Sequence, residues 1–227
     1  MLPAHIKAVV FDAVGTVLHP VDGAPKVYAE TAAKYGIIDT PAAILARFRE
    51  AYLVEEEIDR LNHWLTDEAR EVRRWQAIVA AALPGSPAEC FEELYRHFAK
   101  PEAWFAPPEA QAVFAELKER NLGVGLGSNY DSRLLTVIAG RPELRALRSK
   151  VFVSSIVGSR KPGRDFFSAV AADFRCNFEE IAFVGDDLKN DYEGAAQAGM
   201  CPILLDAMNQ HPEVANRIVD LCGLLRR

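Results

Sequence analysis

The sequence predicts an α/β fold in which a parallel sheet, covered by helices on both faces, is interrupted by an inserted block of helices. Three observations lead to this prediction. The first apolar segment, Lys7–Phe11, is nearly continuous, as in strands that are buried on both faces. After residue 100, short apolar segments alternate with helical ones. Between them, residues 24–100 are rich in alanine, glutamate, arginine and leucine and almost lack β-branched clusters.

The inserted block is expected to contain four helices. Thr40 followed by Pro41 is a typical helix start, and Thr66 is a candidate N-cap for the third helix. The segment LPGSP at 83–87 should end one helix and begin the next. The expected helices are Pro25–Tyr35, Pro41–Asn62, Asp67–Leu83 and Pro87–Ala99.

The second half of the chain alternates between helix and strand, which is typical of βαβ units. Residues 1–20 and 101–227 are therefore expected to form one core, and residues 21–100 a second domain inserted into it. The expected elements, in order, are helix Glu109–Arg120, strand Leu122–Leu126, helix Ser132–Ile138, strand Val151–Ser154, helix Arg164–Asp173, strand Ile181–Val184, helix Asp191–Ala198 and strand Pro202–Leu205.

Composition excludes several classes of protein. The 227 residues suffice for a core with an insertion, and the net charge of −6 without a basic stripe argues against nucleic-acid binding. Apolar runs such as Ile78–Leu83 are too short to span a bilayer, and the N-terminal segment lacks a signal-peptide pattern. The four cysteines are far apart, as expected for free thiols in the cytoplasm. A monomer and a homodimer both remain open.

Polar residues follow each of four predicted strands. Because ligands bind beyond the carboxyl ends of the strands in open α/β sheets, these residues are expected to meet at one edge. Each group alone has an ordinary explanation as a turn, a cap or a solvated surface, but the four together favour a site. They are Asp12, Gly15 and Thr16 after the first strand, Ser128, Asn129 and Asp131 after the second, Lys161 after the third, and Asp186, Asp187 and Asp191 after the fourth.

This combination suits covalent attack on phosphorus by a carboxylate. A divalent cation held between acids of two strands would reduce the repulsion between the anions, and Mg²⁺ prefers oxygen ligands. Lys161 would add positive charge beside Asp12, and Ser128 would bind phosphoryl oxygens. Gly15 would let the loop backbone approach closely. Covalent attack divides one difficult step into two easier ones.

The segments FDAVGTV, GLGSNYD, GSRKPGRDFF and FVGDDLKNDYEGAAQAGM resemble the motifs of the haloacid dehalogenase-like hydrolase superfamily, and the resemblance covers nearly the whole chain. It implies a Rossmann-like core, a helical cap at 21–100, a bound Mg²⁺ ion and an aspartyl intermediate. The implied roles are Asp12 as nucleophile, Asp12, Asp186 and the Val14 carbonyl as metal ligands, Ser128 and Lys161 in catalysis, Gly15, Thr16 and Asn129 in substrate binding, and Asp187 and Asp191 in orienting metal-bound water.

Val14 departs from the pattern of most phosphatases in this superfamily, which carry a second aspartate there as general acid and base. Valine keeps the backbone carbonyl but cannot transfer a proton, and such transfer is typically worth about 10²–10⁴ in rate. Asp22, His19 and Asp131 are candidate replacements that the sequence does not rank.

Three functions follow from the resemblance and its departure. The first is a Mg²⁺-dependent phosphatase acting on a small phosphorylated substrate. The second is a 2-haloacid dehalogenase acting on a halogenated one, because halide leaves without a proton. The third is a descendant that only binds a ligand or partner. Candidate pocket residues in the cap are Tyr28, Arg47, Phe48, Tyr52, Trp64, Arg70, Arg73 and Trp75.

Overall fold

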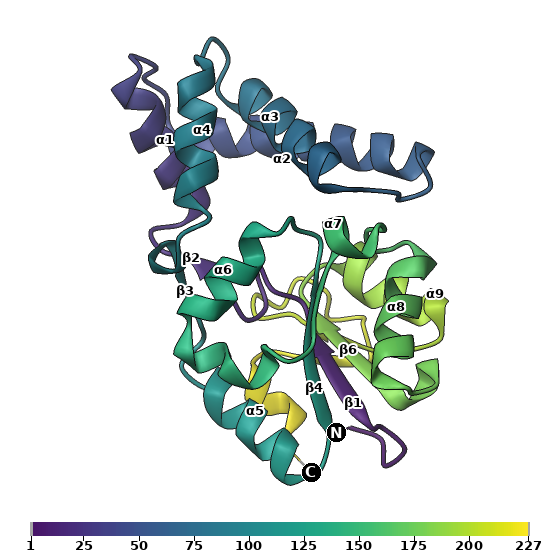
Figure 1. The fold of residues 1–227 in the computed structure, drawn as a ribbon. Helices are drawn as coiled ribbons and strands as arrows, with labels where there is room; N and C mark the ends of the chain where they lie inside the picture. The colour runs from purple at the N-terminus through teal and green to yellow at the C-terminus, as the bar shows by residue number, and fades with distance from the viewer. Residues whose placement is uncertain (1, 227) are drawn as a thin grey trace.

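A six-stranded parallel sheet lies at the centre of the computed structural model, which describes residues 2–226 (Figure 1). The strands lie in the order β5-β4-β1-β6-β7-β8 and every neighbouring pair is parallel. This confirms the predicted α/β class; β8 is a short, half-buried strand that was not predicted. The strands are β1 (Ala8–Phe11), β4 (Gly123–Ser128), β5 (Val151–Val153), β6 (Ile181–Gly185), β7 (Cys201–Leu205) and β8 (Arg217–Ile218).

Strand β1 lies between β4 and β6, and its register decides where the polar residues emerge. Phe11 is paired with Leu126 of β4 and with Val184 of β6. β1 ends at Phe11, and β4 and β6 end one or two residues beyond the residues paired with it. The loops that follow these three strands therefore leave the sheet at the same edge. The predicted convergence of these loops follows directly from the parallel register.

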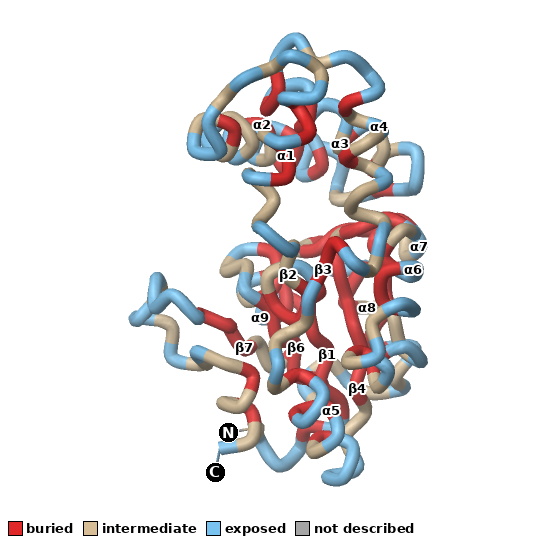
Figure 2. Tube along the Cα trace, turned by 90° about the vertical axis from the view of Figure 1, so that its left-hand side faces the viewer, coloured by how far each residue is buried: buried red, intermediate tan, exposed pale blue. Residues whose placement is uncertain are grey.

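Helices cover both faces of the sheet, as predicted. Side chains alternate along β1: Val9 and Phe11 belong to one apolar core, and Ala8 and Val10 belong to another. The first core is covered by α5 (Ala110–Glu119), α6 (Arg133–Gly140), η2 (Pro142–Leu147) and η5 (Leu221–Leu224), and the second by α8 (Arg164–Phe174) and α9 (Gly194–Ala198). Figure 2 shows the strands as the most continuously buried part of the trace.

Four helices pack together beyond the carboxyl ends of the strands, and we call them the helical unit (Figure 1). Their shared apolar core includes Tyr28, Ile44, Val79 and Leu94. A small antiparallel pair, β2 (His19–Pro20) with β3 (Trp104–Phe105), lies where the chain enters and leaves the unit. The helices are α1 (Ala24–Lys34), α2 (Pro41–Leu61), α3 (Glu68–Ala82) and α4 (Ala88–His97).

The predicted N-cap residue is correct for α2 but not for α3. The Thr40 side chain accepts a hydrogen bond from the Ala43 N–H, as an N-cap does. At α3 the N-cap is Asp67, whose carboxylate accepts from the Arg70 N–H, so the prediction for Thr66 was wrong. The Thr66 hydroxyl instead donates to the Glu71 carboxylate, because Thr66 is buried against the side of the helix.

Several short elements complete the chain and were not predicted. They include a π-helix where an α-helix beginning at Asp191 was expected, and α9 follows it. Within residues 2–226, no helix combines the length and the apolar character that crossing a membrane requires. The short elements are η1 (Pro101–Ala103), α7 (Ser154–Val157), η3 (Phe178–Glu180) and the π-helix η4 (Leu188–Glu193).

Candidate active site

Asp12 is the first residue after β1 and is largely buried at the edge of the sheet. Its backbone N–H donates to the Val184 carbonyl at 2.8 Å, which continues the ladder to β6 by one residue. The Lys161 ammonium donates to Asp12 Oδ1 at 2.6 Å, to Asp191 Oδ1 at 2.6 Å and to the Gly127 carbonyl at 2.9 Å. These three acceptors satisfy the three N–H bonds of the ammonium group and fix its position.

Asn129, which follows β4, holds the backbone of Lys161. Its side-chain amide donates to the Lys161 carbonyl at 2.8 Å, and its side-chain oxygen accepts from the Lys161 N–H at 2.7 Å. Asn129 also lines the central cavity, together with Ser128. The contact therefore positions the lysine while leaving Asn129 beside the space where a ligand would lie.

Three carboxylates meet beside the lysine, and we call Asp12, Asp186 and Asp191 the acid cluster. Each contributes an oxygen, and these oxygens lie within 4.8 Å of one another. Asp186 opens onto the cavity and is exposed, whereas Asp12 and Asp191 are buried. With Lys161 as the ammonium group that contacts the cluster, two negative charges are left uncompensated.

The protonation equilibria reflect this excess of negative charge. Burial, and then the charge of Asp12, raise the pKa of Asp186 to about 7. Burial also raises the pKa of Asp191 well above its ordinary value, although Lys161 opposes the shift. Burial alone would lower the pKa of Lys161, but Asp12 and Asp191 outweigh it and raise that pKa. Lys161 is therefore a permanent cation, whereas Asp186 takes up a proton readily when no cation neutralises the cluster.

Two glycines make room for the acid cluster. Gly15 has a φ of +94°, and a Cβ there would lie 2.2 Å from Asp186 Oδ2. A Cβ on Gly185 would lie 2.1 Å from Asp191 Oδ2. The Thr16 hydroxyl donates to Asp186 Oδ1 at 3.1 Å. Gly15 and Thr16, predicted to bind substrate, are not among the cavity-lining residues that the structure describes, and their contacts position Asp186 instead.

Asp187 lines the cavity but does not join the acid cluster. Its carboxylate accepts hydrogen bonds from the backbone N–H groups of Lys189 and Asn190, both at 2.9 Å, and so caps the π-helix. It also accepts from the Asn190 side-chain amide at 3.0 Å. Asp191 is thus the acid of this segment that approaches both Lys161 and the other two carboxylates.

A cavity of about 290 Å³ separates the acid cluster from the helical unit. Its far side includes six aromatic side chains whose rings contact one another in a chain, and we call them the aromatic wall. Phe48 is central to it, with ring centroids 5.7 Å from Tyr28, 6.2 Å from Tyr52 and 6.3 Å from Trp75. The members are Tyr28, Phe48, Tyr52, Trp75, Phe98 and Trp104.

Two arginines on the cavity are already paired with acids of the protein. Arg133 donates to both oxygens of Asp131 at 2.7 Å, and its guanidinium lies 3.3 Å from the centre of the Tyr95 ring. Arg160 pairs with Glu71 and also approaches Asp59 at 3.3 Å. The positive charge of each guanidinium is therefore already balanced by an acid of the protein.

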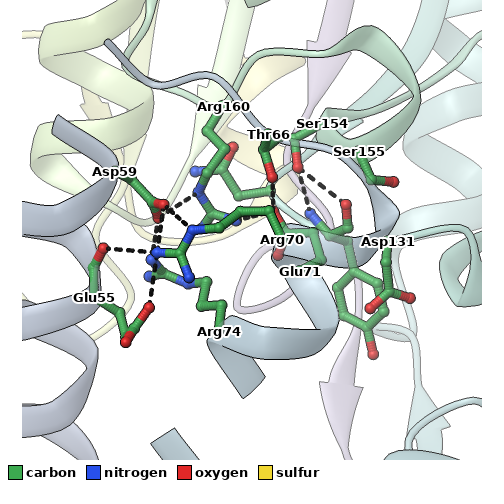
Figure 3. Close-up of polar contacts among 12 residues, drawn as sticks. Glu55, Asp59, Thr66, Arg70, Glu71, Arg74, Asp131, Ser154, Ser155 and Arg160 are labelled. Atoms are coloured by element: carbon green, nitrogen blue, oxygen red, sulfur yellow. Dashed lines mark hydrogen bonds and ion pairs between the residues drawn. The ribbon is translucent and has the colours of Figure 1, made fainter. Parts of the chain in front are cut away.

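Arg160 belongs to a buried group of charges between the core and the helical unit, which we call the junction cluster (Figure 3). Three arginines face three acids in it, so it is electrically balanced. Asp59 is fully buried and contacts all three arginines. Backbone hydrogen bonds from Thr66 to Gly158 and from Arg160 to Trp64 join the same two segments. The members of the cluster are Glu55, Asp59, Arg70, Glu71, Arg74 and Arg160.

The sequence identified part of the cavity lining. Tyr28, Phe48, Tyr52 and Trp75 line the cavity, but Arg47, Trp64, Arg70 and Arg73 are not among the described lining residues. The same holds for Asp22, His19 and Asp131, the candidate replacements for a proton donor. Arg133, Arg160 and Asn190 line it and were not predicted, although each lies within two residues of a predicted site residue.

Comparisons with known proteins agree on the family. The model of haloacid dehalogenase-like hydrolases matches residues 6–199. An uncharacterized hydrolase of Schizosaccharomyces pombe is 31% identical over 198 residues, which is 84% of this chain and 86% of the relative. The human haloacid dehalogenase-like hydrolase domain-containing protein 3 is 28% identical over 215 residues, with 88% and 82% covered.

Solved structures show the same fold. An L-2-haloacid dehalogenase superposes with a TM-score of 0.78 at 20% identity, covering 97% of both chains. A phosphatase from Thermococcus onnurineus superposes with a TM-score of 0.68 at 21% identity, covering 96% of both chains. Because both a dehalogenase and a phosphatase match at low identity, these structures leave the two chemistries unresolved.

Proposed function

Because the chain belongs to the haloacid dehalogenase-like hydrolase family, we propose that it is a Mg²⁺-dependent phosphatase that cleaves small phosphate monoesters through an intermediate on Asp12. One observation carries the proposal: the acid cluster has two more negative charges than its lysine compensates. A divalent cation matches that deficit, and the donors are the hard oxygens that Mg²⁺ prefers. A dehalogenase of this family needs no such ion.

In this proposal the Asp12 and Asp186 carboxylates and the Val14 carbonyl hold the metal. Mg²⁺ supplies charge that offsets the repulsion between Asp12 and the phosphoryl group. Thr16 orients Asp186 through its hydrogen bond, and Gly15 leaves the space that Asp186 occupies. Lys161 contributes a second positive charge beside Asp12.

The reaction has two steps. An Asp12 oxygen attacks phosphorus, the bond from phosphorus to the ester oxygen breaks, and the leaving group departs with the electron pair. Ser128 binds phosphoryl oxygens during this step. Water, oriented by Asp191, then attacks the aspartyl phosphate, releasing phosphate and restoring the Asp12 carboxylate. We further propose that residues 21–100 form a cap domain over the core of residues 1–20 and 101–227, since the helical unit supplies four of the six residues of the aromatic wall.

A second candidate function is hydrolysis of a 2-haloacid. Val14, which cannot supply a proton, favours it because halide leaves as a stable anion. The charge of the acid cluster speaks against it, since carboxylate substrates would be repelled there unless a cation were present. The paired state of Arg133 and Arg160 also speaks against it, since neither offers a free charge for the substrate carboxylate.

The test compares three reactions of the purified chain. p-Nitrophenyl phosphate is offered with MgCl₂ and with EDTA, and L-2-chloropropionate is offered in EDTA. We expect nitrophenolate release with Mg²⁺ and none with EDTA, and a loss of about 10³-fold or more in Asp12→Asn. Asp173→Asn is the matched control, because Asp173 is a surface carboxylate paired with Lys150.

Each other result assigns a different function. Chloride release in EDTA without metal-dependent phosphate release would establish the dehalogenase instead. Silence in all three reactions, in a protein that is shown to be folded by circular dichroism, would favour a protein that only binds its ligand. Equal activity of Asp12→Asn and the original chain would exclude Asp12 as the nucleophile.

A further inference from the structure

The cavity combines three features that bear on the leaving group of the substrate: its aromatic wall, its lack of uncommitted charge away from the acid cluster, and Val14. Resting on the proposed phosphatase function, we propose that the site selects monophosphate esters of uncharged phenols over alkyl phosphates and over substrates with a second charged group. The phosphoryl group would lie at the acid cluster and the aryl ring against the aromatic wall.

Shape and composition favour a ring. The six side chains of the aromatic wall present mainly apolar surface, and their ring contacts, with centroids 5.6 to 6.3 Å apart, form a continuous chain from Tyr52 to Trp104. Planar apolar groups bind such walls through burial and through stacked or edge-to-face contacts. At about 290 Å³, the cavity lies near the lower end of the range for small-molecule sites, which suits a single-ring ester.

The charges around the cavity disfavour a second charged group. Among the described lining residues, the cationic ones are Arg133, Arg160 and Lys161, and each is paired with acids of the protein. The acidic ones are Asp12, Asp186, Asp187 and Asp191, all at the edge of the sheet. A carboxylate or ammonium group on the far part of the substrate would lose its hydration without gaining an unpaired opposite charge among these residues.

Val14 disfavours alkyl leaving groups. It lies two residues after Asp12, lines the cavity and is 37% exposed. A bound substrate would therefore contact an aliphatic side chain there, which cannot donate a proton to the leaving group. Asp22, His19 and Asp131 are not among the described lining residues. Tyr28 and Tyr52 are weak proton donors, since burial raises the pKa of each.

Without a donor, the leaving group departs as an anion, and its basicity decides the rate. A phenol has a pKa of about 10, whereas an aliphatic alcohol resembles water, at about 15.7. The bond between phosphorus and a phenolate oxygen therefore breaks without help far more readily than that to an alkoxide. In the balanced step, Asp12 forms the new bond to phosphorus, the phenolate takes the electron pair, and solvent protonates it afterwards.

The experiment compares kcat/KM for three esters and one acyl phosphate with the full chain in MgCl₂: phenyl phosphate, benzyl phosphate, 4-carboxyphenyl phosphate and acetyl phosphate. Benzyl phosphate keeps the ring but has an alkyl leaving group, and acetyl phosphate has a good leaving group without a ring. We expect phenyl phosphate to exceed benzyl phosphate by about 10²-fold or more. It should exceed 4-carboxyphenyl phosphate by about tenfold or more.

Two variants separate the contribution of the aromatic wall from that of the missing proton donor at Val14. Phe48→Leu removes the central ring of the aromatic wall but keeps apolar volume, so it should raise KM for phenyl phosphate about fivefold and KM for acetyl phosphate by clearly less. Val14→Asp should raise kcat for benzyl phosphate by about 10²-fold and that for phenyl phosphate much less.

The outcomes distinguish this proposal from the function on which it rests. Turnover of acetyl phosphate with equal or better use of benzyl than of phenyl phosphate would overturn the proposal and leave the phosphatase standing. Preference for 4-carboxyphenyl phosphate would overturn it as well. Failure to hydrolyse any of the four compounds in the presence of Mg²⁺ would overturn the phosphatase function and this proposal together.

Discussion

The junction cluster and the acid cluster are both groups of charges that the fold brings together, but they are balanced differently. The junction cluster sets three arginines against three acids, and Asp59 at its centre contacts all three arginines. The acid cluster sets three carboxylates against Lys161. Similar residue types, brought together by the same fold, therefore give one neutral group and one with two negative charges in excess.

This difference agrees with a structural role for the junction cluster and with the catalytic role that we propose for the acid cluster. Removing either partner of a buried ion pair strongly destabilises the protein, because the remaining charge is left without compensation. A group with excess negative charge is less stable as it stands and gains stability from any cation that fits it. Removing a carboxylate should thus have opposite effects on stability in the two clusters. Two of the following four predictions test this directly, and the other two test the excess charge of the acid cluster.

The largest effect is expected for Asp59→Asn. The substitution keeps the size of the side chain but leaves three buried guanidinium groups with two acids. We expect the free energy of unfolding to fall by about 3–5 kcal/mol. Urea denaturation followed by circular dichroism measures this loss.

Glu116→Gln is the matched control for the removal of one acidic partner. Glu116 pairs with Arg120 on the surface, where both side chains are about 40% exposed, so the change should be below about 1 kcal/mol. A loss in Asp59→Asn no larger than that of the control would mean that the junction cluster is not a unit held by its charges.

The next effect concerns Mg²⁺ and pH. Proton binding competes with metal binding at Asp186, whose pKa is raised to about 7 by burial and by Asp12. Because that folded pKa lies above the unfolded one, the stability that Asp186 contributes is full below about pH 4 and is lost as the pH rises through 7. If Asp186 holds Mg²⁺ as proposed, the ion would replace the proton above this range.

Stabilisation by Mg²⁺ should therefore be greater at pH 8 than at pH 6. At 100 times the dissociation constant, a ligand adds about 2.7 kcal/mol, and a tenfold loss of affinity removes about 1.4 kcal/mol of this. Melting temperatures with and without MgCl₂ at the two pH values give the comparison. An equal shift at both values would show that Asp186 does not titrate between them.

A smaller effect of opposite sign to Asp59→Asn is expected for Asp186→Asn. At pH 8 without metal, the substitution removes one excess negative charge and should raise the free energy of unfolding by about 1 kcal/mol. The figure is modest because the carboxylate opens onto the cavity, where solvent screens it. The gain should shrink as the pH falls, and below about pH 4, where Asp186 is protonated in both the folded and the unfolded state, the two proteins should unfold alike. The variant should also lose the response to Mg²⁺.

The convergence of the acid cluster could be predicted from the sequence because it depends on topology alone. Asp12 and Asp186 follow β1 and β6, which are parallel neighbours, and Lys161 approaches from the loop after β5. The fold class follows in the same way from the alternation of strands and helices. Neither requires knowledge of how individual side chains pack.

Other roles could not be predicted because they depend on side-chain packing. Arg160 is adjacent to Lys161 in the chain, but its partners Asp59 and Glu71 come from helices whose docking the sequence does not specify. Asp187 directly follows Asp186 in the sequence and is the same residue type. Its carboxylate nevertheless accepts hydrogen bonds from backbone N–H groups and caps the π-helix. Local conformation, and not residue type, distinguishes the two acids.

The smallest effect is expected for the hydrogen bond from the Thr16 hydroxyl to Asp186. Thr16→Val keeps the shape of the side chain but removes the hydrogen bond to Asp186, which favours the charged carboxylate. A single hydrogen bond is worth about 1 kcal/mol, so the affinity for Mg²⁺ should fall about fivefold. Thr31→Val, a buried threonine in α1, is the matched control and should leave the affinity unchanged. Titration of Mg²⁺ by calorimetry measures both. Unchanged affinity in Thr16→Val would mean that the Thr16 hydroxyl does not affect how strongly Asp186 binds the cation. The excess charge of the cluster alone would then determine how tightly a cation is held.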